Sequence, residues 1–525
     1  MSNIVFLIPF IPIVIAGLIT FIDSKKVIPK ISIFFSLIIV GLSIYGTYQQ
    51  FKTNHAIVSE NLLLSFDRLS SILTLYVAIL GIVIRKYSAK YMWDEVGYKR
   101  FFILLNFIFS SIYFLLMANH ILLIIMAWIS LSLSLYYLIS FRSYSKSATY
   151  FGNITLWIHR LGDLLFVLSM IMIVSQCKTP YLSELKYMWL KGSFDLEIPG
   201  VLLILAAMVK SAIIPFHIWL PYTSEGPTPV SALMHAGVVN VGGIILNKFA
   251  YLFLHTEYAL NIAFIFGLIT AIIGSLIMLT MPDIKRALGY STVGQMGYMI
   301  MEVGVGAFSL AIYHLMVHGI FKATLFLESG NVIHQARKEP NITKSVSYKI
   351  FLEEETKFNK NLNLIVISLT TALVLYTVIE FLLKQDLSNY YAALIFLAFG
   401  WLASFQLFST FFKISKVQSL GIILSLIISF ALIVLIYSFL GLTFENYLYG
   451  ENYKKLFEAA HLSFGLIVMA IVFLILSAVF VWFLSYYYTF SENGEKFKKW
   501  ILKIYRILYE ELYYRKLILK LFKMD

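Results

Sequence analysis

The 525 residues are 60% hydrophobic and only 13% charged, with a mean hydropathy of +0.83, whereas soluble domains are roughly 45–50% apolar. This composition excludes an ordinary soluble enzyme and predicts an all-α polytopic membrane protein. The net charge of +13 is spread over short segments between apolar runs, which excludes a nucleic-acid-binding face. The single cysteine, Cys177, cannot form an intrachain disulfide, and without a Cys/His cluster we expect no metal or other cofactor in this chain.

Apolar runs long enough to cross a hydrocarbon core of about 30 Å recur from residue 4 to residue 488. The first run contains Pro9 and Pro12 and lacks a basic leader and a cleavage site, so we expect it to stay as the first helix. About fifteen transmembrane helices are predicted, at residues 3–22, 28–48, 69–84, 101–118, 120–141, 153–175, 199–220, 229–254, 259–280, 290–307, 309–333, 361–383, 390–412, 418–440 and 462–488.

The basic residues predict the orientation of these spans. With the N-terminus placed outside, the inner segments hold 29 of the 41 Lys and Arg residues, and the outer segments hold 8. Cytoplasmic loops are enriched in Lys and Arg. We therefore expect a multi-pass protein of the cell (inner or plasma) membrane with its N-terminus outside and its C-terminus in the cytoplasm.

Two segments are not predicted to span the membrane. Residues 334–360 are rich in charge and form a polar cytoplasmic loop within the transmembrane domain, which covers residues 1–490. In the C-terminal segment, residues 491–525, apolar side chains recur at helical spacing between Lys and Arg. This pattern predicts a cytoplasmic or interfacial amphipathic helix attracted to anionic membrane lipid, or else a solvated tail.

Several predicted spans contain ionisable residues. A charge at the bilayer centre costs about 2.5–3.5 kcal/mol on insertion scales, so such a residue needs a partner, water or a function. Arg160 and Asp163, three residues apart, can form an ion pair on one helix face. Lys210 precedes Pro215, so we expect it in mid-helix beside a break whose freed carbonyls line a hydrated cavity, with Asp163 as the nearest candidate carboxylate.

Histidines occur in two later spans. His235 follows the turn at residues 226–229, and it is interpreted either as a proton relay or as a buried structural histidine. His314, His318 and Lys322 are spaced four and four, which places them along one helical stripe about 12 Å long. Three titratable groups on one face favour a proton wire over a metal site, because no third metal ligand is spaced nearby.

Five motifs resemble the antiporter-like subunits of respiratory complex I and the Mrp antiporters, the group that includes NADH dehydrogenase subunit 5. They are residues 208–215 (MVKSAIIP), 226–236 (GPTPVSALMHA), 283–292 (DIKRALGYST), 295–298 (QMGY) and 314–323 (HLMVHGIFKA). The resemblance covers residues 60–335. It implies antiporter-like inverted repeats of helices, each with a broken helix, around a central line of Lys and His that carries protons.

The resemblance also implies a role for single residues. Lys210 is similar to the family's broken-helix lysine, and Arg160 and Asp163 match its Arg-x-Gly-Asp pattern as a supporting ion pair. The implied proton or cation path consists of Lys210, His235, His314, His318 and Lys322.

The chain departs from the respiratory subunits at three places. Where those subunits have Trp-Glu on the fifth helix, this chain has Trp128 and Ile129, so the glutamate that pairs with the lysine is missing. The family's later motifs are not recognisable, and only Glu380 and Lys384 are candidates for a second half-channel. The chain also ends soon after its fifteenth predicted helix, with too few residues for the lateral helix of subunit 5.

Residues 234–243 (MHAGVVNVGG) look like the version found in the DAB inorganic-carbon accumulation systems. In that family a membrane subunit, DabB (MpsA in some relatives), works with DabA, a zinc-containing subunit similar to a β-carbonic anhydrase. The resemblance implies that a flow of protons or Na⁺ through the membrane subunit drives the hydration of CO2 to bicarbonate. We expect a transporter subunit rather than an enzyme, without a cofactor, and with zinc in a DabA-like partner on the cytoplasmic side.

Two alternatives remain at this stage. The first is a proton-pumping, NADH-quinone oxidoreductase-like translocase in complex I, a membrane hydrogenase or an Mrp Na⁺/H⁺ antiporter, against which Ile129 and the short C-terminus count. The second is a membrane anchor that only recruits a soluble enzyme, with its ionisable residues paired for stability.

Overall fold

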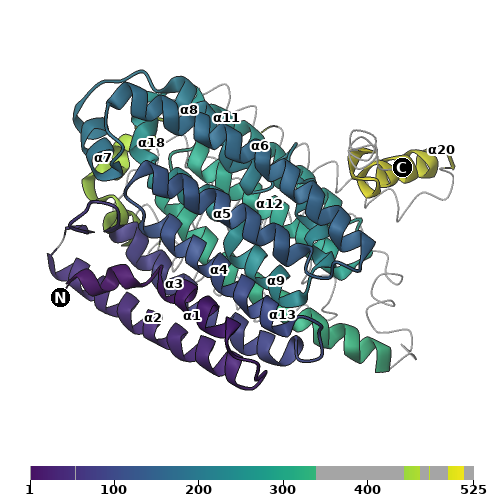
Figure 1. Cartoon of the computed structure of the whole chain (residues 1–525). Coiled ribbons are helices and arrows are strands. Elements are labelled where there is room, and N and C mark those ends of the chain that lie inside the picture. The colour runs from purple at the N-terminus through teal and green to yellow at the C-terminus, as the bar shows by residue number, and fades with distance from the viewer. Residues whose placement is uncertain are drawn as a thin grey trace, which may run out of the picture. The chain divides into compact units, whose positions relative to one another are not determined.

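The computed structural model describes residues 2–53, 55–338, 441, 443–460, 472 and 495–513, and every structural statement below refers to these residues. The chain divides into two compact units, of which the first is formed by Met1–Val332, Tyr447–His461 and Leu508–Asp525. The long helices of the first unit run side by side (Figure 1). All the described candidate site residues lie in this unit.

The first unit begins with three helices that precede a short hairpin. A 3-10 helix, η1 (Ser2–Leu7), leads into α1 (Ile11–Thr20), which has a proline in its first turn, where a missing backbone N–H leaves no intrahelical bond unmade. The longer α2 (Val27–Thr53) follows, and α1 packs against both α2 and α4 (Tyr98–Met117).

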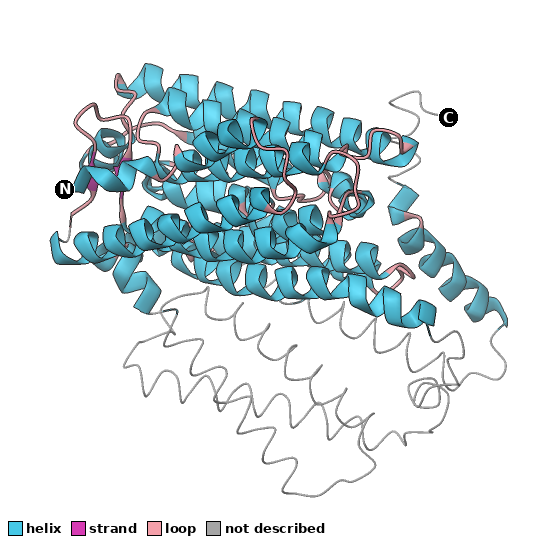
Figure 2. Ribbon diagram, turned by 60° about the horizontal axis from the view of Figure 1, so that its bottom comes forward, coloured by secondary structure: helices cyan, strands magenta, loops and turns pink. Residues whose placement is uncertain are grey.

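The hairpin is the only sheet in the described residues. Strands β1 (Ile57–Val58) and β2 (Ser65–Phe66) pair antiparallel, and Figure 2 shows them in magenta at one end of the helices. Asp67 then caps α3 (Arg68–Tyr91) by accepting a hydrogen bond of 2.9 Å from the backbone nitrogen of Ser70.

Three more long helices follow. They are α4 (Tyr98–Met117), α5 (Ile121–Ile139) and α6 (Lys146–Cys177). Each packs against its neighbour in sequence, with α4 on α5 and α5 on α6. The side chain of Ser145 caps α6 by accepting from the backbone of Ala148.

The next segment contains the helix break that the sequence predicts. After a short helix, α7 (Leu182–Lys191), α8 (Glu197–Lys210) stops and the chain continues through two 3-10 turns, η2 (His217–Trp219) and η3 (Pro221–Glu225). Helix α8 packs on α6 and on two later helices, α10 (Val241–Lys248) and α11 (Ala259–Met278).

A second interrupted helix follows. It consists of α9 (Thr228–Leu233), one π-helical turn η4 (Met234–Val238), α10 (Val241–Lys248) and a 3-10 helix, η5 (Ala250–His255). The segment from residue 228 to residue 248 is buried throughout by other helices. It therefore lies inside the first unit rather than at its surface.

Three long helices complete the part that bears the candidate site. Helices α11 (Ala259–Met278) and α12 (Ile284–Gly304) form the most extensive helix pair of the described chain. Asp283 caps α12 by accepting a 2.8 Å hydrogen bond from the backbone of Arg286, so the Asp-Ile-Lys-Arg motif starts a helix. The last, α13 (Phe308–Lys338), continues into the first five residues of the loop predicted from residue 334.

Shorter elements are described near the C-terminus. They are η7 (Gly450–Asn452), α18 (Tyr453–Glu458), α20 (Glu495–Tyr509) and η8 (Glu511–Tyr513). Helix α20 lies within the predicted amphipathic segment, and its position at a membrane surface stays a prediction. The division into domains at residue 490 also stays a prediction.

Eight helical segments of the described chain are long and apolar enough to cross a membrane. They are Val27–Thr53, Arg68–Tyr91, Tyr98–Met117, Ile121–Ile139, Lys146–Cys177, Thr228–Lys248, Ala259–Met278 and Phe308–Ser329. This result agrees with the predicted helical membrane fold. The predicted spans 361–383, 390–412, 418–440 and 462–488 fall outside the described residues apart from position 472, so the total of fifteen stays a prediction.

Candidate functional site

Lys210 is the last residue of α8. We expected it in mid-helix, but the helix stops there because Ala212 adopts a left-handed conformation (φ +54°) and Pro215 has no backbone N–H to continue the ladder. The carbonyl of Val209 accepts a 3.1 Å hydrogen bond from the indole of Trp219, and that of Met208 accepts one of 2.9 Å from Ile213. Both of these freed carbonyls therefore accept hydrogen bonds from protein groups, and the hydrated cavity stays a prediction.

The ammonium group of Lys210 lies between α5 and α6. Its nitrogen is 3.4 Å from Oδ1 of Asp163, donates a hydrogen bond to the hydroxyl of Ser132 and lies 4.8 Å from the centre of the Trp128 ring. Asp163 also pairs with Arg160, at 2.7 Å. One carboxylate is thus shared by two cations, and Ser132 and Trp128, both on α5, complete the surroundings of the lysine.

His235 lies in the π-helical turn η4. The extra residue of this turn is visible in the 3.0 Å hydrogen bond from the backbone of Val239 to the carbonyl of Met234. The imidazole ring is buried and stacks on Phe326 of α13, with 4.2 Å between ring centres. His235 is therefore held against the helix that carries the other two predicted histidines.

His314, His318 and Lys322 follow one another on successive turns of α13. The rings of His314 and His318 are perpendicular, with centres 6.0 Å apart. The ammonium of Lys322 is buried, forms no ion pair with an acidic group in the described chain and donates to the carbonyl of Leu288 at 3.3 Å. His318 lies within electrostatic range of His314, Lys322 and His235. The structure thus brings four of the five predicted path residues together.

Helix α8, which ends at Lys210, packs on the helix that follows His235 in the chain, α10. The hydroxyl of Ser211 donates to the carbonyl of Val239 at 2.8 Å, and Gly242 lies so close to α8 that an added Cβ would be 2.5 Å from the carbonyl oxygen of Ala207. No hydrogen bond between Lys210 and His235 is present in the described chain. The predicted substitutes Glu380 and Lys384 lie outside the described residues, and their role stays a prediction.

Glu302 was missed by the sequence analysis. It is fully buried on α12, and its Oε2 is 3.1 Å from Nδ1 of His314. The other ring nitrogen of His314 is 2.9 Å from Oε1 of Gln295. Both nitrogens are therefore engaged, which does not favour a metal site shared by His314 and His318. The sequence could have indicated it, because Glu302 is the only charged residue in the predicted span 290–307.

The sequence analysis also gave no role to a third buried lysine, Lys248. Lys248 donates hydrogen bonds to the carbonyls of Leu115 and Leu116 at 2.9 and 2.7 Å, at the end of α4. Nearby, Asp67 pairs with Lys186 at 2.8 Å. Burial alone would raise the pKa of Asp67, but the two lysines and the Ser70 backbone hold it well below its usual range. Lys248, Asp67 and Lys186 therefore connect the ends of several helices, and each of them has a hydrogen-bond or ion-pair partner.

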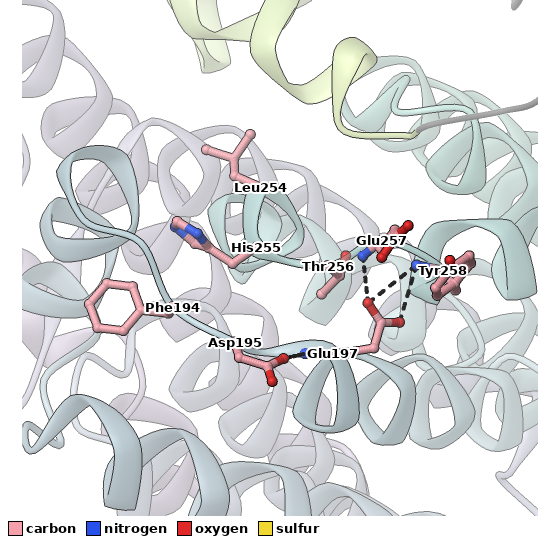
Figure 3. Close-up of a pocket in the computed structure, with 8 residues that line it drawn as sticks. All are labelled: Phe194, Asp195, Glu197, Leu254, His255, Thr256, Glu257 and Tyr258. Atoms are coloured by element: carbon pink, nitrogen blue, oxygen red, sulfur yellow. Dashed lines mark hydrogen bonds between the residues drawn. The ribbon is translucent and has the colours of Figure 1, made fainter.

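One shallow open pocket lies apart from these groups (Figure 3). Asp195 and Glu197 line one side of it, and Glu257 and Tyr258 line the other. Figure 3 shows that the carboxylate of Glu197 accepts hydrogen bonds from the backbone nitrogens of Glu257 and Tyr258. The carboxylate of Glu197 therefore connects the start of α8 to the residues just before α11.

Comparisons with known proteins agree with this architecture. A family model described as "NADH:quinone oxidoreductase/Mrp antiporter, TM" matches residues 118–349. A second, "NADH-Ubiquinone oxidoreductase (complex I), chain 5 N-terminus", matches residues 57–102. In fold, the chain is similar to a subunit of the Mrp complex from Dietzia sp., with a TM-score of 0.61 and 21% identity over 95% of this chain and 59% of that one.

Two curated relatives are similar in sequence. The "Probable inorganic carbon transporter subunit DabB1" of Halothiobacillus neapolitanus is 35% identical over 98% of this chain and 95% of its own length. Subunit L of the NADH-quinone oxidoreductase of Buchnera aphidicola is 34% identical over 65% of this chain, which spans 59% of that relative. The chain therefore belongs to the NADH:quinone oxidoreductase/Mrp antiporter family of multi-pass, cation-translocating membrane subunits, and its predicted resemblance to DabB-type members is confirmed.

Proposed function

We propose that this chain conducts protons as the membrane subunit of a two-component, energy-coupled inorganic-carbon accumulation complex. The observation that carries the proton part is the buried group formed by His235, His314, His318 and Lys322, beside the lysine site at Lys210. The inorganic-carbon part is supported by the 35% identity, over 98% of the chain, to a protein named as a probable inorganic carbon transporter subunit.

The chemistry of the site favours protons over Na⁺. Ammonium and imidazolium groups release and take up protons, whereas neither offers the oxygen ligands that hard cations bind. Lys210 keeps its proton while its ammonium pairs with the carboxylate of Asp163. It can release that proton when the carboxylate moves toward Arg160, because the charge of the ammonium is then less well balanced. His235, Lys322 and His318 then lie within electrostatic range of one another, so a charge on one disfavours a charge on the next.

The rest of the complex follows from the same proposal. Catalysis takes place in a DabA-like, zinc-containing partner on the cytoplasmic side, and this chain supplies the ion flow without a cofactor of its own. The N-terminus lies outside the cell and the C-terminus in the cytoplasm. The relatives are named as subunits of larger assemblies, which supports a partner of this kind.

The test uses cells that lack carbonic anhydrase and cannot grow in air. We expect the chain, expressed with a DabA-like partner, to restore growth and bicarbonate uptake, and an uncoupler to abolish both because the ion gradient drives the reaction. Lys322→Ala should lower uptake at least tenfold with the complex still assembled, because it removes the titratable group beside His318 and His235. Lys26→Ala, which changes an exposed lysine outside the path, is the matched control.

Full uptake by an assembled Lys322→Ala complex would contradict the proposal and support a membrane anchor instead. The main alternative, a proton-pumping subunit of complex I, a membrane hydrogenase or an Mrp antiporter, is favoured by the two family models. That alternative predicts co-purification with quinone-reducing or antiporter subunits in place of a zinc-containing partner.

A further inference from the structure

A buried carboxylate stands at the end of the histidine group. Glu302 is on α12, within the predicted span 290–307, and its side chain is completely shielded by the described chain. An uncompensated carboxylate in such a position is strongly disfavoured, so it must either be protonated or face a cation. The side chain that it faces is His314, with 3.1 Å between Oε2 and Nδ1.

The second ring nitrogen of His314 determines which protons the pair can hold. Nε2 lies 2.9 Å from the carbonyl oxygen of the Gln295 side chain, which accepts but cannot donate, so Nε2 carries a hydrogen. Nδ1 therefore either accepts a hydrogen bond from a protonated Glu302 or, in the imidazolium form, donates one to the carboxylate. In both cases a single proton is shared between Glu302 and His314.

The second oxygen of the carboxyl group, Oε1 of Glu302, is buried and has no hydrogen-bond partner in the described chain. It can take up a proton from a direction that Nδ1 of His314 does not occupy. On the far side of His314 comes His318, whose ring centre is 6.0 Å away and whose two nitrogens form no hydrogen bonds in the described chain. One bridging water suits that separation.

We propose that Glu302 is the terminal proton-carrying residue of the path, exchanging protons with His314. A proton added at Oε1 gives the neutral acid, whose O–H bond breaks as the N–H bond at Nδ1 forms. The products are a carboxylate and an imidazolium. When the Gln295 amide rotates away from Nε2, the Nε2 hydrogen passes to a water on the His318 side. This leaves the other neutral tautomer of His314, whose Nε2 accepts a hydrogen bond from the NH2 group of the rotated amide. This inference rests on the proposed function and adds a residue to its path.

The test measures proton flux into liposomes that contain the full-length chain, with an internal pH dye and an imposed K⁺ potential. Glu302→Gln keeps the shape and a hydrogen bond to His314 but cannot titrate, so flux should fall at least tenfold. Glu302→Asp keeps the carboxylate and should retain at least a third of wild-type flux. Glu197→Gln removes a carboxylate outside the path, at the pocket of Figure 3, and should leave flux unchanged.

Comparison with Lys322→Ala separates the two proposals. If Glu302→Gln stays within twofold of wild type while Lys322→Ala loses flux, the Glu302 assignment is wrong and the path stands. If Lys322→Ala keeps wild-type flux, or the wild-type chain carries none, the proposed function has failed. If Glu302→Gln and Glu302→Asp both lose flux and thermal stability, Glu302 has a structural role and the assignment is overturned.

Discussion

At the scale of single residues, Asp163 connects a structural ion pair to the lysine site. Its two carboxylate oxygens face different cations, with Oδ2 2.7 Å from Arg160 and Oδ1 3.4 Å from Lys210. Arg160 remains charged at any physiological pH, whereas a lysine in a desolvated site can lose its proton. The cluster can therefore alternate between one net positive charge and none, and the change is carried by Lys210.

Asp163→Asn should disable this site. It removes the only charge that balances Lys210 and Arg160 in the cluster, and breaking a buried pair by removing one partner costs about 3–5 kcal/mol. We expect a lower thermal unfolding temperature and at least a tenfold loss of bicarbonate uptake, measured on purified protein and on cells. The control is Asp195→Asn, at an exposed position. Unchanged uptake in the Asp163→Asn variant would show that Lys210 does not depend on this carboxylate.

At the scale of elements, glycines set how closely α11 and α12 approach. A Cβ added at Gly297 would lie 2.4 Å from the backbone nitrogen of Ala271, and one at Gly267 would lie 2.5 Å from that of Met301. Small residues of this kind let the backbones of membrane helices pack together. The close pairing positions α12, and with it Gln295 and Glu302, against α13.

Gly297→Ala should therefore destabilise the protein. Alanine gains about 1 kcal/mol of helix propensity over glycine, but the clash is with backbone and cannot be relieved by a rotamer change. We expect a net loss of about 1–3 kcal/mol, the usual cost of overpacking, seen as a lower unfolding temperature in detergent. Gly17→Ala, at an exposed helical site with nothing within 4 Å, should be neutral or slightly stabilising. Equal behaviour of the two variants would contradict the packing argument.

At the scale of the whole molecule, the asymmetry of basic residues predicts the orientation. Cytoplasmic segments are enriched in Lys and Arg, so the proposed orientation places the N-terminus outside and the C-terminus in the cytoplasm. Lys26 belongs to a predicted inner segment and Lys191 to a predicted outer one, and both are exposed in the structure.

Cysteine labelling tests this orientation directly. Cys177, the single cysteine of the chain, is buried and is replaced by serine to give a clean background. A membrane-impermeant maleimide added to intact cells should then label Lys191→Cys but not Lys26→Cys. Inverted vesicles should give the opposite pattern because they expose the cytoplasmic face. Labelling of Lys26→Cys in intact cells would reverse the proposed topology.

The sequence by itself determined the features that depend on one segment at a time. Apolar runs of sufficient length predict membrane helices because lipid requires each span to satisfy its own backbone hydrogen bonds. The spacing of His314, His318 and Lys322 predicts a shared helix face, since 3.6 residues make one turn. Pro215 predicts a break after Lys210. Each of these follows from local geometry.

Only the tertiary structure decided which helices supply the partners. Ser132 contacts Lys210 from α5, Glu302 reaches His314 from α12, and Phe326 stacks on His235 from α13. Such pairs depend on how far one helix is shifted and rotated against another, which hydrophobic periodicity within a single helix does not specify. Charges buried in the membrane make this register decisive, because a shift of one turn would leave Glu302 and Lys210 without the groups that compensate them.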